Sequence, residues 1–139
     1  MGGTLPSSVV QAWVVHWVVD GMNVIGSRPD GWWRDRAGAR RRLVSDLAGL
    51  VAPGSEVTVV FDGRPGPGEI DDAEAAGVTA RFAPGGPNAA DHAIVEMLGS
   101  EAGSPTVTVV TSDGALADAV RRLGIPVEGV RTFRERLPQ

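Results

Sequence analysis

Three runs of mostly β-branched residues, each ending in aspartate, constrain the fold of this chain more than any other feature. They are WVVHWVVD (13–20), VTVVFD (57–62) and TVTVVTSD (106–113). Side chains that are apolar at consecutive positions suit strands buried on both faces, as in a parallel sheet. The segments VTARF (78–82) and IPVEGV (125–130) are weaker strand candidates.

Segments with helical periodicity lie between these strand candidates. Apolar residues recur at helical spacing within 34–51, 89–99 and 114–123, and a short helix is expected within 69–76. The alternation of strands and helices predicts an α/β fold. We expect a three-layer α/β/α sandwich around a mainly parallel sheet of about five strands.

The length of 139 residues suits one domain with a substantial core. Residues 1–12 are small and polar without a sustained period, so we expect a flexible leader there and a single domain over 13–139. The segment FRERLPQ (133–139) is expected to form a short closing helix or a tail. No apolar run is long enough for a transmembrane helix.

The residue types that the chain lacks exclude several classes of site. All 13 basic residues are arginine, so the lysine of a P-loop, a Schiff-base enzyme or a phospho-receiver domain is missing. With no cysteine, disulfides and thiolate zinc sites are excluded, and a cytoplasmic location is expected. The net charge of −4 argues against a protein that coats nucleic acid by charge alone.

Four aspartates are placed where a ligand would bind. Asp20, Asp62 and Asp113 end the three strand-like runs, and Asp91 begins the helical segment 89–99. The carboxyl ends of parallel strands lie on one edge of a sheet, so these side chains are expected to converge there. Each aspartate taken alone is equally well explained as a turn former or a helix N-cap. Their shared position at strand ends favours a functional role.

Converging carboxylates repel one another unless their pKa values rise or a cation binds among them. Oxygen ligands without cysteine or an obvious set of histidines favour Mg²⁺ or Mn²⁺ over zinc. One or two such ions can activate water and stabilise the leaving oxygen of a phosphodiester. The sequence therefore predicts a divalent-metal centre and leaves the number of ions open.

Four motifs resemble, in order and spacing, the YacP-like branch of the NYN domains, which are relatives of the PIN-domain nucleases. They are VVDGMNVIG (18–26), VTVVFDG (57–63), NAADHAIVE (88–96) and TVTVVTSDGALADAV (106–120). The resemblance implies a five-stranded α/β/α sandwich and a metal-dependent ribonuclease that leaves a 5′-phosphate. RNA is the implied substrate, and a second copy of the chain or a ribosomal or RNA-processing partner stays open.

The resemblance also assigns catalytic residues. It places the Mg²⁺ or Mn²⁺ ligands on Asp20, Asp91 and Asp113. It makes Asp62 a fourth catalytic carboxylate, which acts as a ligand or supports one.

Other motif positions imply contacts to substrate. Asn23 is expected to orient a carboxylate or contact a phosphate, and Thr111 and Ser112 match polar positions that help to bind metal water or substrate. An aromatic residue often precedes this asparagine in the family. Met22 stands in its place here, so base stacking is not expected at that position.

The loop SRPDGWWRDR (27–36) should lie at the rim of the site. Its candidate substrate contacts are Arg28, Trp32, Trp33, Arg34 and Arg36. The tryptophans can stack on bases while the arginines contact phosphates. The alternative is that the tryptophans pack on the domain and the arginines are solvated. Arg64, close after Asp62, is a further phosphate-binding candidate.

The remaining charged residues are assigned surface or structural roles. The consecutive arginines 40–42 cannot share one helical face and are expected on a solvated surface. Glu96 lies five positions after Asp91 and should point away from it. His16 lies inside the first strand, where a structural role is expected, and His92 should face another side of its helix than Asp91.

A metal-dependent ribonuclease is therefore the favoured function. The alternative is a non-catalytic RNA-binding or adaptor domain that keeps the same fold. A phosphatase of the haloacid-dehalogenase type is disfavoured, because it needs an Asp-x-Asp motif where this chain has DGM (20–22), and because lysine is missing.

Overall fold

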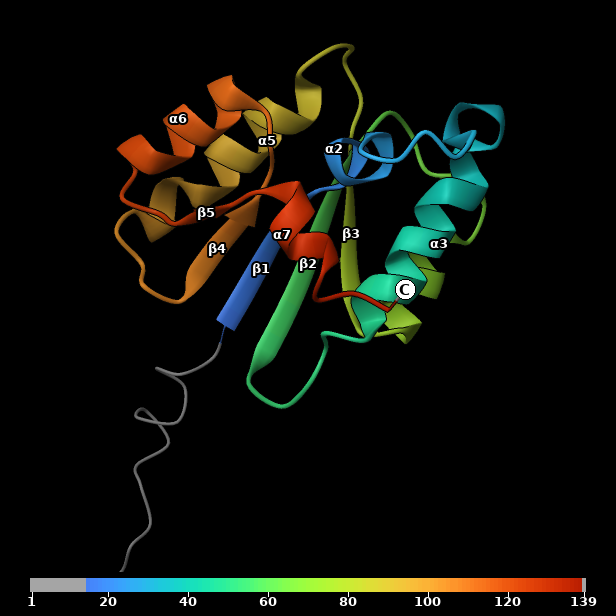
Figure 1. Ribbon diagram of the computed structural model, residues 1–139, viewed down its shortest axis with the longest axis horizontal. Helices are drawn as coiled ribbons and strands as arrows, with labels where there is room; N and C mark the ends of the chain where they lie inside the picture. The colour runs from blue at the N-terminus through green and yellow to red at the C-terminus, as the bar shows by residue number, and fades with distance from the viewer. Residues whose placement is uncertain (1–14, 139) are drawn as a thin grey trace, which may run out of the picture.

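A parallel sheet of five strands forms the middle layer of the protein (Figure 1). The computed structural model describes residues 15–138. The strands are β1 (Val15–Asp20), β2 (Ser55–Asp62), β3 (Val78–Ala83), β4 (Val107–Val110) and β5 (Val127–Glu128). All neighbouring pairs in the order β3-β2-β1-β4-β5 are parallel. After β3 the chain crosses to the other side of β1, which creates the switch in strand order where ligands bind in such sheets.

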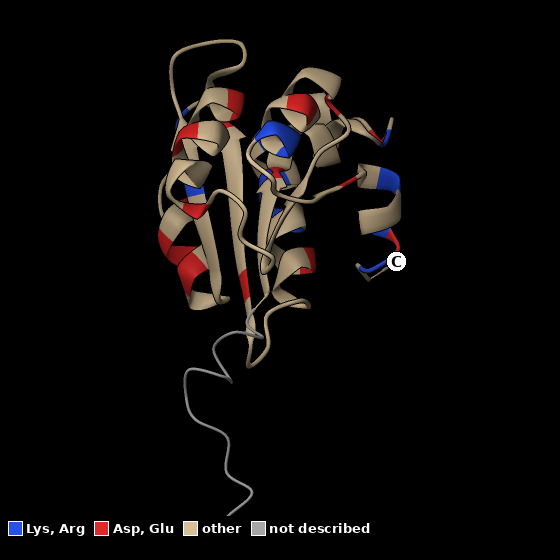
Figure 2. Cartoon of the chain, turned by 90° about the vertical axis from the view of Figure 1, so that its left-hand side faces the viewer, with Lys and Arg blue, Asp and Glu red and all other residues tan. Residues whose placement is uncertain are grey.

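Helices cover both faces of the sheet (Figure 2). The α-helices are α2 (Gly21–Gly26), α3 (Arg36–Ala48), α4 (Glu69–Ala75), α5 (Ala89–Leu98), α6 (Gly114–Arg122) and α7 (Val130–Arg134). Two short 3₁₀ helices are η1 (Trp32–Arg34) and η2 (Gly99–Glu101). Side chains of α2, α3, α4 and α7 share one apolar cluster, and those of α5 and α6 share another. The predicted three-layer α/β/α sandwich is confirmed.

Alternating side chains along the strands divide the core between the two faces. In β1, Val18 packs in the cluster of α5 and α6, whereas Val19 packs in the cluster of α2, α3, α4 and α7. In β2, Val60 likewise packs in the cluster of α5 and α6, and Phe61 packs in the cluster of α2, α3, α4 and α7. All four side chains are fully buried. Burial on both faces explains why consecutive positions in these runs are apolar.

Several predicted boundaries are corrected. The run 106–113 predicts a strand to its end, but β4 stops at Val110 and the next three residues lead into α6. β5 comprises only two residues of the segment 125–130, and α7 already begins at Val130. The six-residue α2 is absent from the prediction, because a helix this short has no repeated apolar period.

An ion pair between Arg40 and Glu69 joins α3 to α4 and corrects the expectation that arginines 40–42 are all solvated. The Arg40 guanidinium donates from Nε to Glu69 Oε1 and from Nη2 to Glu69 Oε2, the latter at 3.0 Å. The Arg40 side chain is 12% exposed and that of Glu69 is 3% exposed. Arg41 and Arg42 are exposed, as predicted. Consecutive residues of a helix point in different directions, so one of the three faces its neighbour.

His16 has the structural role that its position predicts. Its Nε2 lies 2.9 Å from Thr58 Oγ1 on the neighbouring strand β2. The expected leader over residues 1–12 falls outside the described residues, and the domain limits stay a prediction. Among residues 15–138, no helix has the length and apolarity needed to cross a bilayer.

Candidate active site

Four aspartates lie at the carboxyl-terminal edge of the sheet. Asp20 and Asp62 are the last residues of the neighbouring strands β1 and β2. Asp113 immediately precedes α6 in the connection from β4, and Asp91 lies in the first turn of α5. Four separate segments of the chain each bring one carboxylate to this edge, as the sequence predicts.

Asp20 is fixed by the abrupt change from β1 to α2, and only 5% of the residue is exposed. The next residue, Gly21, lies tightly against β2. A Cβ at this glycine would lie 2.5 Å from Phe61 Cδ1 and 2.9 Å from Val59 Cγ2. Any larger residue would push α2 away from the sheet, which explains the Asp-Gly pair of the first motif.

Hydrogen bonds tie β1 and α2 to the segment that follows β4. The Thr111 hydroxyl donates to Asp20 Oδ2 at 2.9 Å and accepts from the backbone N–H of Asp113 at 3.1 Å. The backbone N–H of Ser112 donates to Asn23 Oδ1 at 2.7 Å. Thr111 and Asn23 therefore hold the first and last motifs in fixed relative positions.

Two of the carboxylates accept hydrogen bonds from helix N-termini. Asp62 Oδ1 accepts from the backbone N–H of Ala90 at 2.9 Å, at the start of α5. Asp113 Oδ1 accepts from the backbone N–H of Leu116 at 2.9 Å and so caps α6. The helix-capping role considered from the sequence is therefore present at Asp113. Capping and ligand binding are compatible, because a carboxylate has two oxygens.

The environment of Asp20 disfavours its charged form. Burial is the main cause, and the charges of Asp91 and Asp62 act in the same direction. The Thr111 hydrogen bond and the Asn23 backbone act against them. The net result raises the pKa of Asp20 to about 6.

Asp91 interacts electrostatically with each of the other three carboxylates. Burial raises its pKa, the charges of Asp113 and Asp62 add to that effect, and His92 opposes it. The four carboxylates thus lie within electrostatic reach of one another, and an all-oxygen donor set of this kind suits a hard divalent cation. Within residues 15–138, no group of three or more Asp, Glu or His side chains is already arranged to hold a metal ion. The donor chemistry fits a cation, and binding one would require the carboxylates to draw closer.

A pocket of about 340 Å³ opens beside Asp62 on the side of α2 and α3. It is lined by Met22, Trp32, Arg36, Arg40, Asp62, Gly63 and Arg64. The Arg36 guanidinium carbon lies 5.2 Å from the centre of the Trp32 ring system. An aromatic surface among cationic groups is the composition of a single-stranded nucleic-acid site. The structure therefore brings three of the predicted contacts, Trp32, Arg36 and Arg64, to the pocket beside Asp62.

Other predicted contacts lie further out. Trp33 is 49% exposed and meets Trp32 edge-on, with ring centroids 6.0 Å apart. Arg28 lines a separate small pocket with Asp30 and Asp46 rather than the one beside Asp62. Glu96 and His92, for which no substrate contact was predicted, are both exposed on α5.

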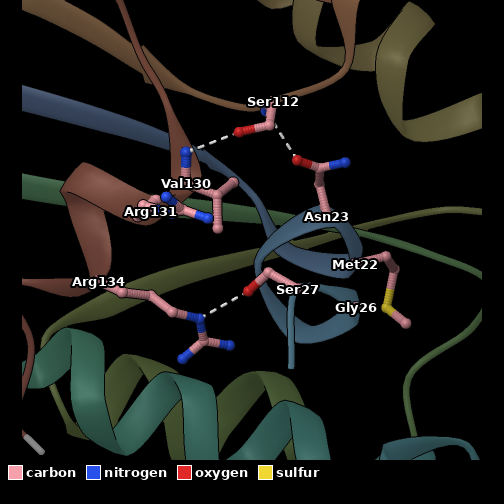
Figure 3. A pocket seen from close by; sticks show the side chains of 8 residues that line it. All are labelled: Met22, Asn23, Gly26, Ser27, Ser112, Val130, Arg131 and Arg134. Carbon is pink, nitrogen blue, oxygen red and sulfur yellow. Dashed lines mark hydrogen bonds between the residues drawn. The ribbon is translucent and has the colours of Figure 1, made fainter. Parts of the chain in front are cut away.

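A larger pocket, of about 490 Å³, lies between α2 and α7 (Figure 3). Its lining residues are Met22, Asn23, Gly26, Ser27, Ser112, Val130, Arg131 and Arg134. Asn23 and Ser112 were expected near the site, but the two arginines of α7 were not. Arg134 lies in the segment 133–139, whose sequence indicates only a closing helix or tail, and Arg131 lies just before it. No local pattern connects either arginine with α2.

The sheet order, the covering helices and the acidic edge define a PIN-like nuclease fold. The chain belongs to the YacP-like NYN domain family, whose model matches residues 17–139. The resemblance seen in the four motifs is thereby confirmed.

Two similar solved structures are crystal structures of Rae1 (YacP) from Bacillus subtilis, one of them of a mutant form. The mutant form is 26% identical, with a TM-score of 0.66, over 87% of this chain and 74% of its own. The other is 27% identical, with a TM-score of 0.66, over 86% of this chain and 71% of its own. No match was found among curated proteins.

Proposed function

We propose that this protein is a ribonuclease that hydrolyses RNA phosphodiester bonds with the help of a bound Mg²⁺ or Mn²⁺. The observation that carries the proposal is the buried Asp20 carboxylate at the carboxyl edge of β1, within reach of the Asp62 and Asp91 charges. Membership of the YacP-like NYN family supports the same reaction class.

Asp20, Asp91 and Asp113 would hold the cation, with Asp62 as a further ligand or a support. When bound, the cation supplies positive charge that neutralises the phosphodiester and lowers the pKa of water. Thr111 keeps Asp20 oriented through its hydroxyl.

The RNA would approach from the side of α2 and α3. Arg36 and Arg64 offer cationic groups for phosphates, and Trp32 offers an aromatic face for a base. Trp33 and Arg28 would contact more distant parts of the strand. The net charge of −4 gives little general attraction for RNA, so these local arginines would supply most of it.

One observation favours the alternative of a non-catalytic RNA-binding or adaptor domain. The described carboxylates are not gathered into a ready metal site. If Asp62 and Asp113 serve only to hold helix N-termini, RNA binding would need no cation and no cleavage would follow.

Cleavage of 5′-labelled single-stranded RNA in Mn²⁺, Mg²⁺ or EDTA tests the proposal. The protein should cut in Mn²⁺ and not in EDTA. Asp20→Asn should cut at least about 100-fold more slowly, because it removes a ligand of the cation that would stabilise transition-state charge. The matched control is Asp118→Asn, because Asp118 is exposed on α6 and forms only a loose pair with Arg121 at 3.8 Å. It should keep full activity.

Unchanged cleavage by folded Asp20→Asn protein would reject the assignment of this residue. RNA binding that survives EDTA, with no product under either cation, would favour the adaptor.

A further inference from the structure

In the described part of the chain, no carboxylate lines the pocket between α2 and α7 (Figure 3). Met22 and Asn23 on its α2 side follow Asp20 closely in the chain, and Ser112 follows Thr111, the partner of Asp20. Chain neighbours of the hydrogen-bonded pair Asp20 and Thr111 therefore line the pocket. Met22 also lines the pocket that contains Trp32 and Arg64, so the two pockets meet at this side chain.

Hydrogen bonds hold three segments together around the pocket. Ser112 donates from its backbone N–H to Asn23 Oδ1 at 2.7 Å, and its Oγ accepts from the backbone N–H of Val130 at 2.9 Å. Because Asn23 accepts through Oδ1, its Nδ2 group is the donor it can offer to a ligand. The end of β4, α2 and α7 thus form a preformed frame rather than a loose surface.

Two arginines give the pocket its charge. Arg134 donates from Nε to Ser27 Oγ at 2.7 Å and from Nη2 to the carbonyl of Val24, so it fastens α7 to α2. Arg131, on the preceding turn, is exposed, and it forms no ion pair within residues 15–138. Arg134 acts as a positioning residue, and Arg131 is the cation available to a ligand.

The lining indicates the chemistry of that ligand. Two guanidinium groups without a carboxylate favour an anion and disfavour a metal ion. Met22 and Val130 add an apolar surface, which inorganic phosphate alone would not use. The volume of about 490 Å³ lies within the range of about 300–1,000 Å³ that small-molecule pockets occupy. A phosphate joined to a ribose and a base meets all three conditions.

We propose that the α2–α7 pocket binds the nucleotide of the RNA that adjoins the scissile phosphate. Arg131 contacts its phosphate, Asn23 donates to it through Nδ2, and Met22 and Val130 contact its ribose and base. The strand then crosses Met22 into the pocket of Trp32 and Arg64. The position next to the scissile bond rests on the proposed ribonuclease function.

Binding of a labelled single-stranded RNA oligonucleotide in EDTA tests the charge contact without catalysis. Arg131→Gln should weaken binding about 3- to 10-fold and lower the slope of log affinity against log salt by about 0.7. Arg122→Gln is the matched control, because Arg122 is an exposed arginine at the far end of α6. It should leave the affinity unchanged.

NMR spectra of the full chain with AMP in EDTA test the location. AMP should shift the backbone amide signals of Gly26, Ser27, Ser112 and Val130, and Arg131→Gln should abolish these shifts. Inorganic phosphate should produce smaller shifts that do not reach Met22.

Equal affinities of Arg131→Gln and Arg122→Gln, or AMP shifts confined to the surroundings of Trp32 and Arg64, would overturn the proposal. Phosphate shifts identical to those of AMP would reject the nucleotide and leave a simple anion site. Cleavage in Mn²⁺ with no AMP shifts in the pocket would reject the pocket and keep the ribonuclease. AMP shifts in the pocket with no cleavage under any cation would reject the ribonuclease and keep the nucleotide-binding pocket.

Discussion

The two faces of the sheet bring opposite charges to the same edge. On one face, α5 and α6 place Asp91 and Asp113 in a pocket of about 270 Å³ that no arginine lines. On the other face, the pocket beside α3 is lined by Arg36, Arg40 and Arg64, and the pocket between α2 and α7 by Arg131 and Arg134. Asp20 and Asp62, at the ends of β1 and β2, lie between the two regions.

This contrast shows why the net charge of the chain says little about its function. The overall value of −4 averages an acidic region and a basic region that meet at the strand ends. A polyanion is attracted by the basic side and repelled by the acidic side. In the proposed ribonuclease, RNA would therefore lie along α2, α3 and α7 and present one phosphate to the carboxylates.

The largest expected effect concerns the ion pair that supports the basic side. Glu69→Gln leaves the largely buried Arg40 guanidinium without its counter-charge and should lower the free energy of unfolding by about 3 kcal/mol. Urea denaturation measures this change. Glu74→Gln, at an exposed position of the same helix, should change it by less than about 0.5 kcal/mol. Equal stabilities of the two variants would show that the pair is dispensable.

The same pair has a dependence on pH. Burial alone would raise the pKa of Glu69, but the hydrogen bonds from Arg40 and the Gly66 backbone, with the charges of Arg40 and Arg41, lower it overall. The folded pKa is below the unfolded one, so the stabilisation is complete above the unfolded value. It is lost as the pH falls through the folded value. Glu69→Gln should therefore differ most from the wild type near neutral pH and least in acid.

The acidic side should behave in the opposite way. The pKa of Asp20 is raised to about 6, above its unfolded value, so its charging destabilises the fold as the pH rises through that range. In EDTA, Asp20→Asn should match the wild type near pH 4 and exceed it by up to about 3 kcal/mol at pH 7. Thermal unfolding at both pH values measures the difference. A variant less stable than the wild type at pH 7 would contradict the raised pKa of Asp20.

A smaller effect is expected at the basic rim. Arg64→Gln should weaken RNA binding about 3- to 10-fold, because one phosphate contact is lost while the fold stays intact. Arg41→Gln, an exposed arginine of α3 outside this pocket, should bind like the wild type. Fluorescence anisotropy at two salt concentrations separates the charge contribution. Identical curves for both variants would remove Arg64 from the RNA path.

The smallest effect is expected at His92. It is exposed on α5, and its charge opposes the rise in the pKa of Asp91. His92→Gln should change the cleavage rate by no more than about twofold, because an exposed side chain outside the carboxylate cluster contributes little. A pH–rate profile would reveal a loss of a hundredfold or more, which would give the histidine a direct catalytic role.

The sequence predicts the acidic edge well because a parallel sheet fixes where its strands end. Asp20 and Asp62 end unbroken apolar runs rich in β-branched residues, which favour buried strands. Asp113 was expected as a strand-end residue, and the structure places it three residues beyond β4 at the start of α6. The edge was therefore predictable, although the boundary of β4 was not.

The basic side was less predictable because it depends on contacts between distant segments. Arg134 reaches Val24 across 110 positions of the chain, and no local pattern records this approach. Arg40 is one of three consecutive arginines, and only the position of Glu69 decides which of them turns inward. Composition and periodicity describe single elements, whereas these arginines are defined by the packing of α2, α3, α4 and α7.

The hydroxyl of Thr111 has a consequence for the chemistry of its neighbour. It carries a single hydrogen, and the Asp113 N–H already donates to its oxygen, so that hydrogen is directed to Asp20 Oδ2. The two hydrogen bonds therefore run in one direction, from the Asp113 N–H at the start of α6 through Thr111 to Asp20 at the end of β1. While Thr111 donates to Oδ2, a proton taken up by Asp20 resides on Oδ1. One threonine therefore makes the two oxygens of a symmetric carboxylate chemically distinct.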